Sequence, residues 1–438
     1  MPGRFVCACV AAAFWFTAAI PARGQGMFDR PVEETTFELS VSQQFDESSN
    51  PAIVVTASIP YRRLVFFLRG RRYEARYRVY LELKERRGKS APGRVWEESV
   101  AVDGFRETTS AARFAATRRT FPVDPGEYTA IVTIEVIDTS RRFREEQSVR
   151  VVGGETGRLE MSTPVFYTCR EDSLFSKPRD GEIAVSTCSS SGEAGSRVNP
   201  GAVYGDFGGW VRVVFGVVAP AAHDGDSLVL TVRMRDARGA VVLYTKETFD
   251  RDGARHSALC LEIGLDSLPI GEYEVDAVLE TADGAQRSQS TGRFALLFNA
   301  GLLASRVDDL VDLLSLVADE KEARAVAEAP AAERVRAWAL FWRKLDPTPS
   351  TESNEAFGDF LQRLRYALKS FSKHQSGWRA DMGKIYIKHG CPDKIEDRQA
   401  SRLGGNYQLW YYYSKGVVFI FEDSMGSGEY HLYSTEMM

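Results

Sequence analysis

An internal repeat constrains the fold of this 438-residue chain more than any other feature of its sequence. The run Pro125-Gly126-Glu127-Tyr128 returns about 145 residues later as Pro269-Ile270-Gly271-Glu272-Tyr273. In both copies an aspartate follows the tyrosine by ten residues, and a last apolar run begins 21 residues after it. The units of solenoid proteins have ~20–50 residues, so this longer period indicates a duplicated domain.

Alternating apolar and polar residues within each copy indicate β-strands. Along 73–83, every second residue would lie on the same face of a strand, and these residues are Tyr73, Ala75, Tyr77, Val79, Leu81 and Leu83. Turn-forming residues separate such runs, as in Asp124-Pro125-Gly126. We therefore expect two all-β, immunoglobulin-like sandwiches, at residues 36–152 and 157–298.

The tyrosine of each repeat follows a glycine at the start of a long strand-like run. This arrangement resembles the tyrosine corner of immunoglobulin-like domains, in which the phenol hydrogen-bonds to the backbone just upstream. An ordinary hairpin entry is the alternative. Under both interpretations, Tyr128 and Tyr273 have a structural role.

The hydrophobic period changes after Asn299. Apolar residues then recur at the three- and four-residue spacing of a helical face in three stretches, which begin near residues 307, 335 and 357. We expect a helical segment at 302–372, whose helices from about 335 pack on the domain that follows.

The last segment, residues 373–438, returns to strand-like runs. They lie at 408–413, 417–421 and 430–433, and the turn Ser414-Lys415-Gly416 is short enough for a hairpin between the first two. The run 384–388 fits either a strand or a helix. We expect a small α+β domain with an antiparallel meander.

The first 24 residues have the pattern of an export signal. Arg4 gives a positive start, residues 5–20 are apolar, and Pro21 ends the run before Ala22-Arg23-Gly24. Small residues at this point are typical of a signal-peptidase site. A retained anchor is the alternative, but sixteen apolar residues are fewer than the ~20 that span a bilayer. We therefore expect cleavage after Gly24, an exported protein in the periplasm or at the outer surface, and no transmembrane span afterwards.

Cleavage would leave four cysteines, Cys169, Cys188, Cys260 and Cys391. No Cys-x-x-Cys pair occurs among them, so their spacing indicates no zinc site. Cys169 and Cys188 flank a Ser- and Gly-rich stretch and could form a disulfide in an oxidising compartment, with two unpaired thiols as the alternative. Cys260 lies in an apolar run and is expected to be a core residue.

Composition and charge exclude several classes of protein. Hydrophobic residues make up 44% and charged residues 26% of the chain, which excludes a wholly disordered chain and a polytopic membrane protein. The net charge of −5 provides no basic excess, and no nucleic-acid partner is expected. Locally, residues 62–87 hold ten Lys and Arg against three Glu. Arg72, Arg76 and Arg78 there form either a solvated sheet face or a patch for an anionic envelope component or an acidic partner.

One motif near the C-terminus resembles a known family. Gly377-Trp378-Arg379-Ala380-Asp381 precedes a short apolar run and then Gly390-Cys391-Pro392-Asp393. Trp342 stands upstream, and Trp410-Tyr411-Tyr412 stands downstream. Together these residues resemble the GWxTD-domain family of exported bacterial proteins, over roughly residues 340–435. The resemblance implies no established biochemical activity.

Two positions depart from the family's pattern. Ala380 stands where the motif has threonine, and Met382 stands where an arginine is common. A mechanism that needs that hydroxyl or that guanidinium would therefore fail in this chain.

The residues of the motif and its surroundings are candidate partner-binding positions. Most of them also have an architectural interpretation, because glycines allow tight turns, tryptophan fills a core and aspartates accept backbone N–H bonds. The alternative is a surface groove in which Trp378, Asp381, Asp393, Trp410 and Tyr412 contact a partner or a glycan. The full set of candidates is Gly377, Trp378, Asp381, Gly383, Tyr386, Gly390, Pro392, Asp393, Trp410 and Tyr412.

The sequence contains no catalytic signature. It has no HExxH, GxSxG, Walker loop or GxGxxG, and its five histidines lack the spacing of metal ligands. We expect no catalytic residue, no cofactor and no metal. The predicted function is an exported, non-catalytic binding or scaffold protein of the cell envelope, which presents its C-terminal domain to a protein or an envelope polymer. The alternative is an envelope hydrolase that acts on glycan or peptide through that domain.

Overall fold

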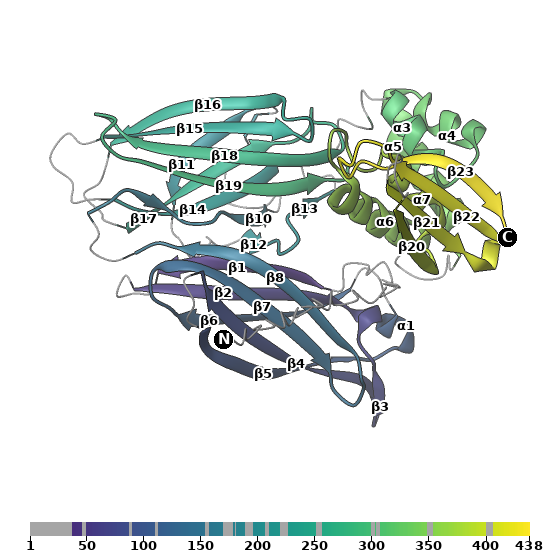
Figure 1. The fold of residues 1–438 in the computed structure, drawn as a ribbon, viewed down its shortest axis with the longest axis horizontal. Helices are drawn as coiled ribbons and strands as arrows, with labels where there is room; N and C mark the ends of the chain where they lie inside the picture. Colours follow the sequence, from purple (N-terminus) through teal and green to yellow (C-terminus); the bar gives the residue numbers. More distant parts are fainter. Residues whose placement is uncertain are drawn as a thin grey trace, which may run out of the picture.

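Figure 1 shows a computed structural model of the chain, coloured from the N-terminus to the C-terminus. It describes residues 37–45, 50–86, 90–109, 113–153, 157–169, 178–179, 181–188, 196–205, 210–219, 227–250, 256–298, 303, 307–347, 354–399 and 406–438. The predicted export signal lies outside the described residues. Two β-rich units are followed by a part that contains helices and a small sheet, so the fold is mixed and rich in β-structure, as expected.

The first β unit, residues 37–153, contains two antiparallel sheets. One has the strand order β1-β2-β6, and the other has β3-β4-β7-β8 with β5 paired to β4. Side chains from both sheets, such as Val55 and Val79, meet in one core. The alternation predicted along 73–83 is present in β4, where positions 75, 77, 79, 81 and 83 are buried. The elements are β1 Glu38–Phe45, β2 Pro51–Pro60, η1 Tyr61–Arg63, β3 Phe67–Arg69, β4 Arg72–Glu85, β5 Ser90–Val102, α1 Phe105–Thr108, β6 Phe114–Pro122, β7 Gly126–Val136 and β8 Arg142–Val151.

The second β unit, residues 157–298, also has two sheets around one core. One has the order β11-β17-β14-β10-β12 with β9 paired to β14, and the other has β13-β19-β18-β15-β16. The strands are β9 Glu160–Met161, β10 Val165–Cys169, β11 Ile183–Cys188, β12 Ser196–Val198, β13 Val203–Tyr204, β14 Trp210–Val218, β15 Ser227–Asp236, β16 Val241–Asp250, β17 His256–Gly264, β18 Gly271–Thr281 and β19 Arg287–Leu296.

The sequence repeat has a counterpart in the sheet orders. The order β5-β4-β7-β8 of the first unit corresponds to β16-β15-β18-β19 of the second, and β1-β2-β6 corresponds to β10-β14-β17. The repeated tyrosines begin equivalent strands, and their phenols make equivalent contacts. Tyr128 Oη donates to the carbonyl of Asp124 at 2.8 Å, and Tyr273 Oη donates to that of Pro269 at 2.6 Å. Both tyrosines therefore fasten the turn that precedes their strand.

Residues 307–438 are called here the C-terminal domain. Their described part places five α-helices beside a four-stranded antiparallel sheet of order β20-β21-β22-β23. Among the described residues, no helix has the length and apolar character needed to cross a membrane. The elements are α3 Val307–Leu314, α4 Glu320–Ala327, α5 Ala331–Leu345, α6 Glu355–Phe371, α7 Asp381–His389, β20 Lys394–Gln399, β21 Asn406–Tyr412, η2 Tyr413–Lys415, β22 Val417–Asp423 and β23 His431–Met437.

The helices join the C-terminal domain to the end of the second β unit. Phe298, just after β19, packs edge-on against Trp338 of α5 with the ring centroids 5.1 Å apart. Ile270 and Leu297 of the second unit belong to the same buried cluster as the helices. The C-terminal domain therefore lies at one end of the second β unit, with the first β unit alongside (Figure 1).

The disulfide prediction needs correction. Cys188 of β11 is bonded to Cys260 of β17, not to Cys169. The two strands are antiparallel neighbours, and Cys188 lies diagonally across from Cys260, with their Cα atoms 5.9 Å apart. The apolar run around Cys260 does place it in the interior, at 1% exposure, but as half of a disulfide. The side chain of Cys169 lies outside the described residues.

Candidate functional site

The GWxTD-like motif forms the connection from α6 to α7. Residues Gly377–Asp381 lead into α7, which begins at Asp381 and ends at His389. The ambiguous run 384–388 is therefore helical. Because α7 packs against both α6 and the sheet, the motif lies between the helical cluster and the sheet of the C-terminal domain.

Two glycines of the motif allow the backbone to approach itself closely. A Cβ atom at Gly377 would lie 2.0 Å from the carbonyl oxygen of Ala367, and one at Gly383 would lie 1.8 Å from the carbonyl oxygen of Gly377. Real Cβ atoms do not come so near to a backbone oxygen, and neither backbone segment can move without displacing α6 or α7. The two glycines are thus required by packing.

Trp378 is a core residue. Its side chain is 2% exposed and lies in the helical cluster with Trp342 and Ile387. The Arg379 guanidinium covers the indole with its central carbon 4.3 Å from the ring centroid, and it also forms ion pairs with Asp309 and Asp312 of α3. The motif therefore fastens α3 to the start of α7.

Ala380 and Asp381 begin α7. Ala380 occupies the N-cap position and has no side chain that could accept a hydrogen bond from the first turn. A carboxylate oxygen of Asp381, Oδ2, accepts a hydrogen bond from the backbone N–H of Leu432 at 3.0 Å, which connects the helix to β23. The missing threonine thus corresponds to a missing helix cap.

The Gly390-Cys391-Pro392-Asp393 segment ends α7 and starts β20. Gly390 is the C-cap residue with φ of 80°, a left-handed conformation that favours glycine. Its carbonyl accepts a hydrogen bond from Tyr412 Oη at 2.8 Å, and Asp393 Oδ2 accepts one from the backbone N–H of Tyr413 at 2.7 Å. Pro392 is buried in this turn. The carboxylate of Asp393 is therefore used to hold the turn against η2.

The remaining aromatic candidates lie in the core between α7 and the sheet. Tyr386 and Trp410 are each 1% exposed and Tyr412 is 2% exposed. Tyr386 stacks on Tyr366 with ring centroids 4.3 Å apart, and Trp410 Nε1 donates to Gln408 Oε1 at 2.7 Å. These rings, like that of Trp378, do not line a surface groove. The structure brings the candidates together as the packing core and turns of one domain.

Sequence reasoning missed a group of basic residues beside this core. His389, at the end of α7, accepts a hydrogen bond at Nδ1 from Lys415 Nζ over 2.9 Å. Burial, with the nearby charges of Lys415, Lys388 and Arg363, lowers the pKa of His389 to about 4. The position of His389 beside the motif was a signal in the sequence. No such signal marked Arg363 and Lys415 in the sequence, because they lie in α6 and η2, far from His389 along the chain.

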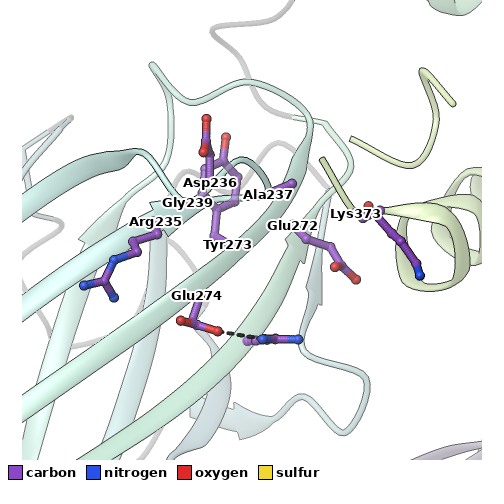
Figure 2. A pocket seen from close by; sticks show the side chains of 10 residues that line it. Arg235, Asp236, Ala237, Gly239, Glu272, Tyr273, Glu274 and Lys373 are labelled. Atoms are coloured by element: carbon purple, nitrogen blue, oxygen red, sulfur yellow. Dashed lines mark hydrogen bonds and ion pairs between the residues drawn. The ribbon is translucent and has the colours of Figure 1, made fainter. Parts of the chain in front are cut away.

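A cavity of about 250 Å³ lies where the second β unit meets the end of α6. Figure 2 shows side chains that line it. Its walls are largely charged, with Arg235 and Lys373 on opposite sides and Glu272 between them. Arg293 is paired with Glu274 at 2.8 Å, and burial raises the pKa of Glu272. No motif candidate lines this cavity. Ligand pockets are usually apolar with few polar groups, so this charged junction is a poor candidate for one.

The basic strand predicted as a possible anionic-partner patch is neutralised by carboxylates from other strands and turns. Arg72 pairs with Asp103 at 2.8 Å, and Arg76 pairs with Asp138 at 3.0 Å. Arg78 contacts both Glu97 and Glu135. The local positive charge counted along the sequence is therefore compensated on the folded sheet face.

Within the described residues, no group of three His, Cys, Asp or Glu side chains is placed to hold a metal ion. At the motif itself, Asp381 lies 3.8 Å from His431 Nδ1 through Oδ2 and 4.0 Å from Lys384 Nζ through Oδ1. A group of basic side chains lies next to the end of α7.

The sequence and the structure were compared with curated proteins and with solved structures. No curated protein matches the sequence. Among solved structures, red sea bream transglutaminase is similar at 7% sequence identity and a TM-score of 0.19, over 60% of this chain and 32% of that chain. The C-terminal domain of the Streptococcus agalactiae AgI/II polypeptide BspA is similar at 8% identity and a TM-score of 0.16, over 60% of this chain and 99% of that one. These TM-scores support no argument about fold or function.

A family model described as the GWxTD domain matches residues 300–436. The match begins about forty residues upstream of the stretch in which the sequence motifs were found, so it includes α3, α4 and α5 together with the sheet. The C-terminal part of this chain therefore belongs to the GWxTD-domain family.

Proposed function

We propose that this protein is an exported, non-catalytic scaffold of the cell envelope, which presents its GWxTD domain to a protein or an envelope polymer. In this proposal the two β units are immunoglobulin-like sandwiches that space and orient the domain. Their strand orders and the two tyrosine contacts support that assignment.

The proposal rests on one observation, which is that the side chains of the motif make their contacts inside the domain. Trp378 is buried, Asp381 holds the backbone of β23, and Asp393 holds the backbone of η2. Both carboxylates therefore act as fasteners of a turn or a strand. A function based on surface contact fits this arrangement better than hydrolysis does.

Contacts between the units support the role of a stiff spacer. Arg62 of η1 in the first β unit contacts Asp359 of α6 at 3.5 Å. On the other side of the domain, the buried cluster around Phe298 joins the helices to the second β unit. A scaffold whose parts are fastened in this way presents its outer surfaces in a constant orientation.

Export is tested by expressing the full chain in a bacterial host and sequencing the N-terminus of the protein in the envelope fraction. We expect the mature chain to begin at Gln25. Recovery of the intact N-terminus in the cytosol would contradict the export part of the proposal.

The scaffold role is tested by cross-linking the mature protein to a solubilised envelope fraction, with assays for hydrolysis of envelope glycan and peptide in parallel. We expect a defined cross-linked partner and no turnover. The Gly383→Ala variant, which disrupts the GWxTD domain, should lose the partner, while Gly93→Ala on β5 should keep it. Turnover of glycan or peptide without a partner would favour the envelope hydrolase instead.

A further inference from the structure

Four basic side chains gather where α7 ends, on the surface of the GWxTD domain. Arg363 comes from α6, Lys388 and His389 come from the last turn of α7, and Lys415 comes from η2. They are separated by up to 52 positions in the sequence and are brought together only by the packing of α6, α7 and the sheet.

Direct contacts define the group. Lys415 Nζ donates to His389 Nδ1 at 2.9 Å, and the imidazole lies against the rings of Tyr412 and Phe419, with centroids 5.5 and 5.1 Å away. Arg363 Nη1 donates to the carbonyl of Ile387 at 3.3 Å. Both Arg363 and Lys388 act electrostatically on His389 and on Lys415.

The positive charge of this group is not balanced within the described part of the chain. No described carboxylate forms an ion pair with Arg363, Lys388 or Lys415, whereas the arginines of β4 are all paired. The nearby Asp393 has one carboxylate oxygen committed to the backbone of Tyr413. The pKa of Lys415 is lowered by burial and by Arg363 and Lys388, and none of these influences comes from an acid.

The free carbonyl groups at the end of α7 do not account for all four basic side chains. Basic residues near a helix C-terminus interact favourably with its last carbonyls. Arg363 already does so at Ile387, and the Gly390 carbonyl is satisfied by Tyr412 Oη. Lys415 instead directs its ammonium to His389, and Lys388 is exposed. A bound anion would therefore relieve the mutual repulsion of these basic side chains.

We propose that Arg363, Lys388, His389 and Lys415 form a binding site for a phosphate group. A guanidinium and two ammonium groups match the charge and the several acceptor oxygens of a phosphate better than those of a single carboxylate. Because His389 Nδ1 accepts from Lys415, its proton lies on Nε2, which adds a neutral donor. Tyr412 and Phe419 hold the imidazole in place.

The site goes beyond the proposed function, since phosphate binding can be measured whether or not the protein is exported or acts as a scaffold. The phosphate could belong to a small molecule or to a phosphodiester polymer of the envelope. Inorganic phosphate and a glycerol-phosphate oligomer serve as the probes that separate these two sources.

The experiment is a calorimetric titration of the mature full-length protein with each probe at low ionic strength. We expect saturable binding that weakens as sodium chloride is added, because salt screens the charges. Binding of both probes would mean that a free phosphate is sufficient. Binding of the oligomer alone would assign the site to a phosphodiester polymer.

Substitutions test whether phosphate binds at these four residues. The double variant Lys388→Gln with Lys415→Gln should lose about tenfold or more in affinity, since each substitution removes a charged hydrogen-bond donor. Lys321→Gln on α4 is the matched control for loss of one exposed charge and should leave the affinity unchanged. Phosphate should also shift the NMR resonance of the His389 imidazole, which the His389→Gln variant assigns.

Three results would overturn the proposal. They are the absence of saturable binding by both probes, an equal loss of affinity in Lys321→Gln, and binding of a glutamate oligomer in place of both phosphates. Circular dichroism of each variant shows that the domain is folded, so that a loss of affinity reports on the site.

Discussion

Arg365 on α6 forms an ion pair with Glu38 at the start of β1, although 327 residues separate the two in the sequence. The pair is mostly buried, with side-chain exposures of 21% for Arg365 and 12% for Glu38. Gly201 of the second β unit leaves room for the guanidinium, because a Cβ there would lie 1.8 Å from Arg365 Nη2. One arginine of the GWxTD domain thus touches both β units.

The Arg365–Glu38 pair should couple the domain to the first β unit. In a double-mutant cycle with Arg365→Ala and Glu38→Ala, we expect a coupling energy of about 1–3 kcal/mol in the free energy of unfolding, measured in urea. The exposed pair Arg324–Glu320, at 2.8 Å on α4, is the matched control and should give a much smaller coupling, because solvent screens it. Equal coupling in the two cycles would show that the junction is energetically unimportant.

Gly383→Ala should destabilise the GWxTD domain by more than about 3 kcal/mol, because the new methyl group would overlap the carbonyl of Gly377. Gly93→Ala provides the control, since a Cβ at that position of β5 meets its nearest atom at 3.8 Å. Thermal unfolding followed by tryptophan fluorescence measures both. A Gly383→Ala protein as stable as the parent would refute the close-approach interpretation of the motif.

Ala380→Ser should stabilise the protein by about 1 kcal/mol, because a serine at the N-cap of α7 can accept a hydrogen bond from the first turn. Ala380→Val adds bulk without an acceptor and should bring no such gain. The two melting temperatures provide the comparison. If serine and valine have the same effect, the threonine of the family motif has a role other than capping.

The pKa of His389 should make stability depend on pH. Burial, with Lys415, Lys388 and Arg363, lowers this pKa from 6.5 to about 4. Between these two values the unfolded chain binds a proton that the folded chain does not, so the free energy of unfolding falls as the pH decreases from 6.5 to 4.

The histidine is identified by comparing urea unfolding at pH 6.5 and pH 5 in a phosphate-free buffer. His389→Gln should reduce the loss of stability between these values, whereas His374→Gln, at an exposed histidine, should not. The same slope in His389→Gln as in the parent would argue against burial of the neutral imidazole.

The Cys188–Cys260 disulfide closes a loop of 72 residues. Replacing both cysteines with alanine should lower the free energy of unfolding by about 2–4 kcal/mol. Cys391→Ala, which leaves the disulfide intact, is the control for a lost thiol. Peptide mapping without reduction should recover residues 188 and 260 in one linked pair. A linked pair of residues 169 and 188 would contradict the structure.

The elements that could be predicted are those whose hydrophobic pattern is continuous. The alternation along β4 and the stripe of α6 are present as expected, because each buries one face. The second stripe is helical as expected, in α5, but Val335 at its start is 63% exposed, and the buried face holds Trp338, Phe341 and Trp342. The sequence does not predict the short helix α4, and it leaves the run in α7 as either a strand or a helix. The nine residues of α7, with apolar members at 382, 385 and 387, fit the period of a strand and that of a helix equally well. Packing against α6 and the sheet decides for the helix.

The candidate site was found by its residues but not by its geometry. Trp378, Trp410 and Tyr412 are candidates for a surface groove in the sequence, and the structure places all three in the core. Burial is not visible in the residue type, because a tryptophan suits a core and a binding surface equally well. The Cys188–Cys260 bond depends in the same way on β11 and β17 becoming neighbours.

The sequence by itself determined the duplicated β units, the change to helices after them and the identity of the GWxTD domain, since these depend on local periodicity and on motifs read in order. Tertiary structure alone decided which charges are compensated. Arg72, Arg76 and Arg78 find carboxylates on other strands and turns, while Arg363, Lys388 and Lys415 meet without one. Electrostatic energy depends on distance in space, which the spacing of residues along the chain does not define.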